Sequence, residues 1–223
     1  MKDRQYNQKL TPEKAAKGID AANKNSSSLL SDAILLFENK RYERAVALAI
    51  LAIEESGKSS IIRAILLEDD PKEIKKGWQN YRRHHEKNAF WIVPELVAKG
   101  ANHIEDLRKT VDKDSDHREV LDNLKQLAFY TDVFSKCKWS IPSDVINKAL
   151  AEGILHTAKI MAGNPDRIMS SEKELELWIK HIKPVWKKEM SKMKQALINC
   201  YQEAENTGLI EKGITRKMIE FLF

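Results

Sequence analysis

The strongest constraint on the fold is a run of nine apolar residues, AVALAILAI, from Ala45 to Ile53. On a helix such a run leaves no polar stripe, so this segment should be surrounded by protein. The chain of 223 residues contains only 8 Gly and 6 Pro, which is low for a chain that would have to turn repeatedly to make a sandwich or a barrel. The sequence therefore predicts an all-α protein built around one central helix.

The rest of the pattern predicts further helices around this one. Thr11-Pro12-Glu13 is typical of a helix start, with a capping hydroxyl, a proline in the first turn and an acid near the positive helix end. We expect this helix to run to about Asn39, with a bend or restart in the polar stretch 23–28. The other expected helices span 41–67, a segment from 71 onward, 104–111, 120–134, 145–161, 171–205 with a kink or restart at Pro184, and 215–222.

These helices are expected to form a bundle over residues 1–165, followed by a C-terminal helical extension over residues 166–223. The alanine-rich central helix, the late helix from Leu175 to Met193 and the apolar end 219–223 offer more hydrophobic surface than one slim bundle readily covers. We therefore expect the extension to pack on the bundle or on a second subunit, and we expect the protein to be a homodimer.

The charge is mixed, with 38 basic and 33 acidic residues and a net charge of +5, which is weak evidence for nucleic acid. The richest basic cluster, between Lys180 and Lys194, is better interpreted as a solvated helix face than as an RNA contact. Cys137 and Cys200 belong to no zinc or disulfide pattern. No apolar run is long enough for a membrane span, and the charged segment before the first helix lacks an apolar stretch, so we expect no signal peptide. We expect a cytoplasmic protein with no membrane partner.

The most informative polar residues close the central helix. Glu54 and Glu55 follow the apolar run directly, and Lys58 lies four residues after Glu54. At least one of the two carboxylates should be partly buried, and a buried carboxylate needs a cationic partner. Lys58 has the favourable spacing and orientation for an ion pair with Glu54.

A second polar stretch places His84 and Lys87 three residues apart, on one helical face, with Tyr81 a turn earlier. Histidine suits proton transfer near neutral pH, and a neighbouring lysine can neutralise a phosphate, which would serve RNA cleavage. The alternative is structural: His84 and Lys87 pair with Glu54 or Glu55 and hold two helices in register. From spacing alone the structural alternative is favoured.

Further along the chain, Tyr130 and Asp132 follow an apolar strip, two residues apart, so they cannot share a helix face. The default interpretation of Tyr130 is a core tyrosine whose hydroxyl has one buried partner. The sequence contains no glycine-rich phosphate loop, no nucleophile elbow and no metalloprotease or di-metal pattern. We therefore expect no cofactor and no metal.

These stretches resemble the AbiV family of abortive infection proteins, a branch of the HEPN superfamily of helical domains. The resemblance spans roughly residues 18–161. It rests on Asp32-Ala33-Ile34-Leu35-Leu36, Arg44 through Lys58, His84-His85-Glu86-Lys87, Tyr130-Thr131-Asp132 and Trp139-Ser140-Ile141-Pro142.

The resemblance implies an HEPN-like helical bundle with additional C-terminal helices, acting in bacterial defence against phage. Many HEPN relatives are dimers that cut RNA without a metal, using an Arg and a His four to six residues apart. None of the ten arginines here has a His at that separation. A ribonuclease would therefore need a different set of catalytic residues. We expect Glu54, Glu55 and His84 to act as acid and base, and Lys58 and Lys87 to bind the phosphate. Tyr81, Tyr130 and Asp132 are expected to support these residues.

Two hypotheses remain open at this point. In the first, the protein is an effector that blocks translation after activation by a phage-encoded protein, with RNA cleavage as one route. In the second, it is a non-catalytic helical dimer that binds a phage protein or a component of the translation machinery, and the Glu, His and Lys residues are scaffolding.

Overall fold

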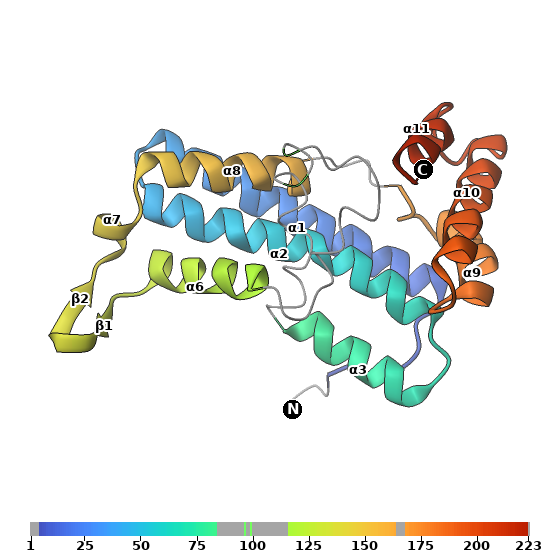
Figure 1. Cartoon of the computed structure of the whole chain (residues 1–223), viewed down its shortest axis with the longest axis horizontal. Helices are drawn as coiled ribbons and strands as arrows, with labels where there is room; N and C mark the ends of the chain where they lie inside the picture. Colours follow the sequence, from blue (N-terminus) through green and yellow to red (C-terminus); the bar gives the residue numbers. More distant parts are fainter. Residues whose placement is uncertain (1–4, 84–95, 97–98, 100–115, 164–167, 223) are drawn as a thin grey trace.

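The computed structural model describes residues 5–83, 96, 99, 116–163 and 168–222. Its two longest helices, α1 (Pro12–Glu38) and α2 (Tyr42–Leu67), lie side by side and run in opposite directions (Figure 1). Thr11 caps α1 by accepting a hydrogen bond from the backbone N–H of Lys14. The expected helix start is confirmed, and so is the central position of α2.

The polar stretch 23–28 does not interrupt α1, which continues through it. Two of its side chains, Asn23 and Ser26, are buried against α2: the Ser26 hydroxyl donates to the Ala52 carbonyl at 2.8 Å, and the Ser59 hydroxyl donates to Asn23 Oδ1 at 3.1 Å. Ser26 is fully buried. Because these small side chains form hydrogen bonds with α2, the two helices can approach closely and α1 continues without a bend.

Two further helices cover the apolar run of α2 and form one hydrophobic cluster with it. They are α6 (His117–Phe129) and α8 (Lys148–Ala162), which pack along α2 at the end where the apolar run lies (Figure 1). Ala47, Ala49 and Ala52 are completely buried, and Leu121 of α6 and Ala158 of α8 pack in the same cluster. The alanine-rich surface of α2 is therefore covered within the chain and is not available to a second subunit, contrary to our expectation.

The other end of α2 packs against α3 (Pro71–Arg82) and α9 (Glu172–Ile182). Ile65, Trp78 and Leu175 share one buried cluster there. α9 begins with a capping box in which Ser171 and Glu174 satisfy each other's backbone N–H groups. The extension thus packs on the bundle of its own chain.

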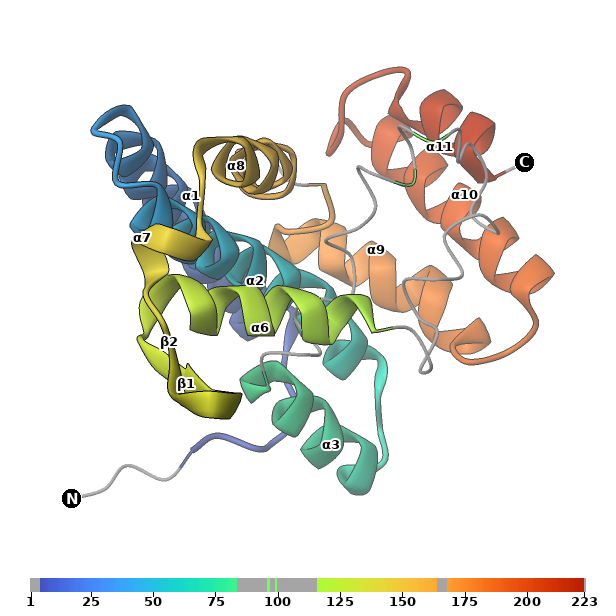
Figure 2. The same ribbon diagram turned by 60° about the vertical axis from the view of Figure 1, so that its left-hand side comes forward.

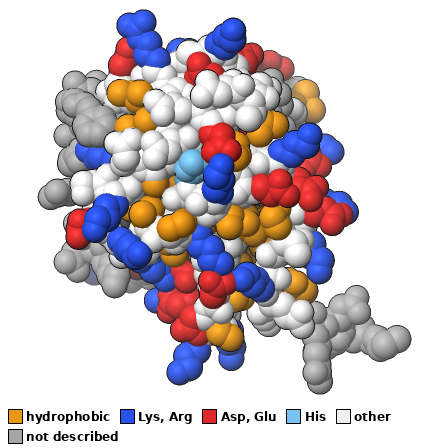
Figure 3. Space-filling view, turned by 90° about the vertical axis from the view of Figure 1, so that its right-hand side faces the viewer, with side chains coloured by type: hydrophobic (Ala, Val, Ile, Leu, Met, Phe, Trp, Pro, Cys, Tyr) orange, Lys and Arg blue, Asp and Glu red, His pale blue; other side chains and the backbone are white. Residues whose placement is uncertain are grey.

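The long late helix restarts at Pro184, as one of the two expected alternatives. After α9 come the 3₁₀ turn Lys183–Val185, then α10 (Met190–Asn206) and α11 (Ile214–Leu222). Together with α9 they form the right-hand end of the molecule in Figure 1, and Figure 2 shows α10 and α11 at its right-hand side. Figure 3 shows this end, where basic and acidic side chains are interspersed.

Lysines of the late cluster bind acids of the same chain: Lys180 binds Glu203, Lys183 binds Asp69, and Lys187 binds both Glu68 and Glu73. Much of the cluster's charge is thus neutralised within the chain.

One expected helix is wrong in part. The segment 120–134 leaves helical conformation at Tyr130, and Asp132–Phe134 forms strand β1, which pairs antiparallel with β2 (Lys138–Ser140). The turn between them contains Lys136 and Cys137 in left-handed conformation, at φ 63° and 56°. A four-residue helix, α7 (Pro142–Val145), then leads to Asn147, which caps α8. The expected segment 104–111 lies outside the described residues.

None of the helices in the described ranges is both long and apolar enough to cross a membrane.

Candidate functional site

The acids that close the apolar run of α2 lie in different environments. Glu54 is buried, with 2 % of its side chain exposed, and its carboxylate accepts a hydrogen bond from Lys125 Nζ at 2.6 Å. Lys125, on α6, also lies 2.7 Å from Asp122 Oδ1 and has 5 % of its side chain exposed. One buried ammonium group is therefore shared by two carboxylates, which joins α2 to α6.

The expected partner of Glu54 was Lys58, and this is wrong. Lys58 Nζ binds Glu55 Oε1, one turn back on the same helix. An i,i+3 spacing serves an ion pair as well as i,i+4 does, and the Glu54 carboxylate turns inward, where Lys125 already lies. As expected, the buried Glu54 carboxylate has a cationic partner, but that partner is Lys125 of another helix.

Glu55 and Lys58 lie nearer the surface, each with 17 % of its side chain exposed. The Lys58 ammonium lies 5.1 Å from the ring centroid of Tyr81, over its face, which is a cation–π contact. The Tyr81 ring in turn meets Trp78 edge to face at 5.4 Å. The structure thus brings together Glu55, Lys58 and Tyr81, where α2 and α3 meet, and we call these three residues the corner group.

Tyr130 and Asp132 do not join the corner group. Tyr130 follows the last residue of α6 and is 61 % exposed, so it is not a core tyrosine. The Asp132 carboxylate accepts a hydrogen bond from the backbone N–H of Val133 at 2.7 Å. Tyr130 directly follows α6 and Asp132 begins β1, so both residues lie at the C-terminal end of α6. His84 and Lys87 lie outside the described residues, just beyond the end of α3.

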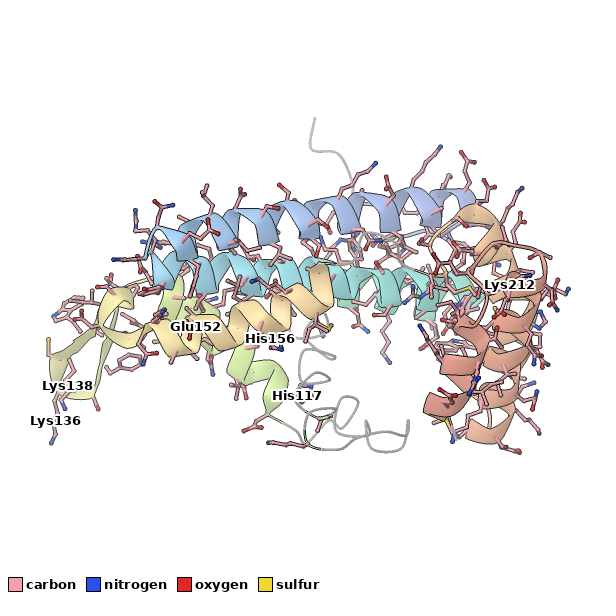
Figure 4. The ribbon with its side chains drawn as sticks, turned by 90° about the horizontal axis from the view of Figure 1, so that it is seen from above. His117, Lys136, Lys138, Glu152, His156 and Lys212 are labelled. Carbon is pink, nitrogen blue, oxygen red and sulfur yellow. The ribbon has the colours of Figure 1, made fainter. Side chains whose placement is uncertain are left out.

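Sequence reasoning missed three residues of this region, namely Lys125, Asp122 and His117. His117, Leu121 and Lys125 are spaced by four, which places them on one buried face of α6. Figure 4 shows His117 at the start of that helix. The spacing of Asp122 and Lys125 alone could have suggested an ion pair, but nothing local connects it to Glu54, 71 residues earlier.

Chemically, the corner group offers an acid, a cation and an aromatic ring that solvent reaches. The Glu54–Lys125 pair is enclosed, so a substrate would have to break a buried ion pair to reach it. Within the parts of the chain that the structure describes, no group of three or more His, Cys, Asp or Glu side chains is placed to hold a metal ion.

Comparison with known families gives one result. The HEPN AbiV family model, described as AbiV, matches residues 14–163, a range that starts in α1 and ends one residue after α8. No curated protein and no solved structure matches the chain. The family model covers well over half of the chain, which confirms the resemblance and the HEPN-like fold followed by C-terminal helices. The chain therefore belongs to the AbiV family, whose members act in abortive infection as a defence against phage.

Proposed function

We propose that this protein is the effector of the abortive response, and that it blocks translation in the cytoplasm of the infected cell once a phage-encoded protein activates it. RNA cleavage at the corner group is the proposed route. The observation that carries this proposal is the Glu55–Lys58 pair, held beside Tyr81 and partly exposed. In the sequence, His84 follows Tyr81 by three residues and Lys87 follows it by six.

In the proposed reaction, the Glu55 carboxylate takes the proton of a ribose 2′-hydroxyl. The 2′-oxygen attacks the phosphorus, the bond from phosphorus to the 5′-oxygen breaks, and His84 protonates that leaving oxygen. The products are a 2′,3′-cyclic phosphate and a 5′-hydroxyl. When Glu55 gains the proton it loses its charge, which frees the Lys58 ammonium to neutralise the phosphate together with Lys87.

We assign Glu54 a different part from the one expected of it. Because its carboxylate is enclosed and already holds Lys125, it would keep α2 and α6 in register rather than contact RNA. A substitution of Glu54 should then reduce stability, whereas a substitution of Glu55 should reduce activity.

The test uses purified protein with total RNA and a translation extract, with and without lysate from phage-infected cells. The wild-type protein should create new RNA ends and stop translation only when that lysate is present. Glu55→Gln should lower the cleavage rate by about 10²- to 10⁴-fold, as the loss of a general base does. Glu13→Gln is the matched control, since Glu13 also pairs with a lysine one turn away, on the exposed side of α1. Intact RNA and normal translation in every mixture would contradict the proposal.

The second candidate is a non-catalytic helical dimer that binds a phage protein or a translation component. Its support is the exposed apolar hairpin, which is a surface for contact rather than for chemistry. This candidate predicts that translation stops without new RNA ends and that Glu55→Gln remains fully active.

A further inference from the structure

A groove of about 660 Å³ runs along α1, beside the segment that leads into α9. Its volume lies within the usual range of small-molecule sites, about 300–1,000 Å³. In Figure 4, α1 forms the upper edge of the bundle, and the C-terminal helices lie near the end where α1 begins. The polar side chains that line the groove include Lys17, Asp20, Asn23, Lys24 and Ser27 of α1 and Ser171 on the other wall.

Asn23 is the most buried of the described residues that line the groove, with 9 % of its surface exposed. Its Oδ1 accepts a hydrogen bond from the Ser59 hydroxyl of α2 at 3.1 Å. Within the described chain, the amide nitrogen of Asn23 has no acceptor. Buried amide N–H groups nearly always have a hydrogen-bond partner, so this one indicates an acceptor on a molecule bound in the groove.

The wall opposite α1 is held in place by its own hydrogen bonds. The Glu174 carboxylate accepts from the N–H groups of Met169 at 3.2 Å and Ser171 at 2.8 Å. The Met169 carbonyl accepts from Arg63 of α2 at 3.3 Å. The Ser171 hydroxyl oxygen accepts from the Glu174 N–H at 3.4 Å, which leaves the hydroxyl proton available as a donor. A wall that is ordered before binding lowers the entropic cost of binding.

Glu174 also shows where an anion would not bind. Its carboxylate already occupies the start of α9, so the positive end of that helix is not the site. The cations available to a ligand are those of α1.

Two ammonium groups and one carboxylate alternate along the α1 side of the groove. Lys17 and Lys24 are seven residues apart, or about 10 Å along the helix axis, and Asp20 lies between them. Each lysine has an exposed ion pair within α1, with Glu13 at 2.6 Å and with Asp20 at 2.8 Å. Such pairs are weak and an ammonium group has three donors, so both lysines can bind a further oxygen.

The same lining disfavours other classes of ligand. Ala16 is the one apolar residue among the described residues that line the groove, and none of them is aromatic. A nucleobase or a lipid chain would therefore find no ring or large apolar side chain to pack against. The donors of the two lysines, Asn23 and Ser171 outnumber the acceptors of Asp20 and Ser27, which favours a ligand rich in oxygen acceptors.

We propose that the groove binds a small sugar that carries two phosphate groups. One phosphate lies at Lys17 and the other at Lys24, and a sugar hydroxyl between them donates to the Asp20 carboxylate. The Asn23 amide and the Ser171 hydroxyl donate to oxygens of the sugar. Because Ser171 begins the C-terminal extension and the other four residues belong to α1, the bound sugar joins the extension to the helical core.

Isothermal titration calorimetry with the purified chain tests the class of ligand. The probes are fructose 1,6-bisphosphate and ribulose 1,5-bisphosphate, compared with fructose 6-phosphate, fructose, inorganic phosphate and ATP. At least one bisphosphate should bind at one site per chain and raise the melting temperature. Fructose 6-phosphate should bind at least about tenfold more weakly, because it lacks one charge-assisted contact. ATP should also bind at least about tenfold more weakly, because the groove gives its base no surface to stack on.

Substitutions on α1 locate the site. Lys17→Gln and Lys24→Gln should each weaken binding by about tenfold or more. Lys14→Gln is the matched control, because Lys14 is an exposed lysine of the same helix outside the groove, and its affinity should be unchanged. All three lysines are exposed, so circular dichroism should show unchanged helicity.

Asp20 tests whether the hydroxyl groups are recognised. The wild-type chain should prefer fructose 1,6-bisphosphate to 1,6-hexanediol bisphosphate, which has both phosphates and no sugar hydroxyl. Asp20→Ala removes the acceptor and should lose this preference.

Asn23→Asp replaces the amide donor by an acceptor and keeps an oxygen for Ser59, so it should abolish binding. Where this buried substitution prevents folding, the exposed lysine variants decide.

Three outcomes would overturn the site. The first is that neither bisphosphate binds at about 10 mM, a concentration that detects even millimolar affinity. The second is binding that Lys17→Gln and Lys24→Gln both leave intact. The third is that inorganic phosphate or ATP binds as tightly as the better bisphosphate. Sugar binding does not involve the corner group, so its failure would leave the proposed function standing.

Discussion

Lys125 Nζ lies 2.6 Å from Glu54 Oε1, inside the bundle and across 71 residues of sequence. The same ammonium group contacts Asp122. The Glu54–Lys125 pair therefore links the central helix α2 to α6, and it takes the place of the i,i+4 pair with Lys58 that the sequence suggested. The contribution of this pair to stability can be tested separately from the proposed catalytic role of Glu55.

Removing the Lys125 ammonium group should strongly destabilise the folded protein. Lys125→Met leaves the Glu54 and Asp122 carboxylates in the bundle without that partner, and we expect a loss of about 3–5 kcal/mol in the free energy of unfolding by urea. The double variant with Glu54→Leu should recover much of this loss, because an apolar pair needs no charge compensation. Lys24→Met is the control: its exposed i,i+4 pair with Asp20 should be worth less than about 0.5 kcal/mol. Equal effects of the two lysine substitutions would contradict the buried pair.

Two glycines in helices should respond to alanine in opposite directions. A Cβ at Gly77 in α3 would stand 2.5 Å from Ile65 Cγ1, so Gly77→Ala should separate α3 from α2 and lower the melting temperature. A Cβ at Gly153 in α8 would meet nothing within 4 Å. Gly153→Ala should therefore add about 0.5–1 kcal/mol through helix propensity alone. A gain in stability for both variants would show that α3 does not pack as described.

Acid should weaken the docking of the extension. Hydrogen bonds from Lys183 and then Lys9 lower the pKa of Asp69 to about 2, from an ordinary 3.8. Because the folded state favours the ionised carboxylate, the stabilisation is complete above about pH 5 and disappears as the pH falls through 4 toward 2. The difference in melting temperature between wild type and Asp69→Asn should follow this course. A difference that stays constant from pH 7 to pH 2 would contradict the assignment.

The two cysteines should differ sharply in reactivity. Burial, with smaller contributions from Glu203 and Glu174, raises the pKa of Cys200 to about 12, whereas Cys137 is exposed in the hairpin turn. At pH 8 a thiol with that pKa is ionised in only about one molecule in 10⁴. Iodoacetamide followed by mass spectrometry should therefore label Cys137 in the native protein and Cys200 only after unfolding in urea. Labelling of Cys200 at the rate of Cys137 would contradict the burial of α10.

Helix boundaries were predictable because their signals are local. Thr11, Asp70 and Ser171 each cap the helix that follows them, and each is visible as a polar residue before a helical pattern. The hairpin was not predictable in this way. Its strands are three residues long, and its turn uses Lys136 and Cys137 in a conformation usually marked by glycine or asparagine.

The candidate site was predictable only in part, for a related reason. The burial of Glu54 follows from the apolar run before it, and the need for a cation follows from that burial. The identity of the cation depends on how α6 is placed against α2, which no spacing within either helix specifies. Likewise, nothing in their own spacing reveals that Tyr130 ends α6 and that Asp132 begins a hairpin strand.

The short connection between the two longest helices affects how the molecule is made. Only Asn39, Lys40 and Arg41 separate α1 from α2, so the largest helix pair in the core forms without the entropic cost of closing a long loop. During synthesis, this pair is available long before α6, α8 or the extension emerges from the ribosome. The later helices then assemble on a template that already exists.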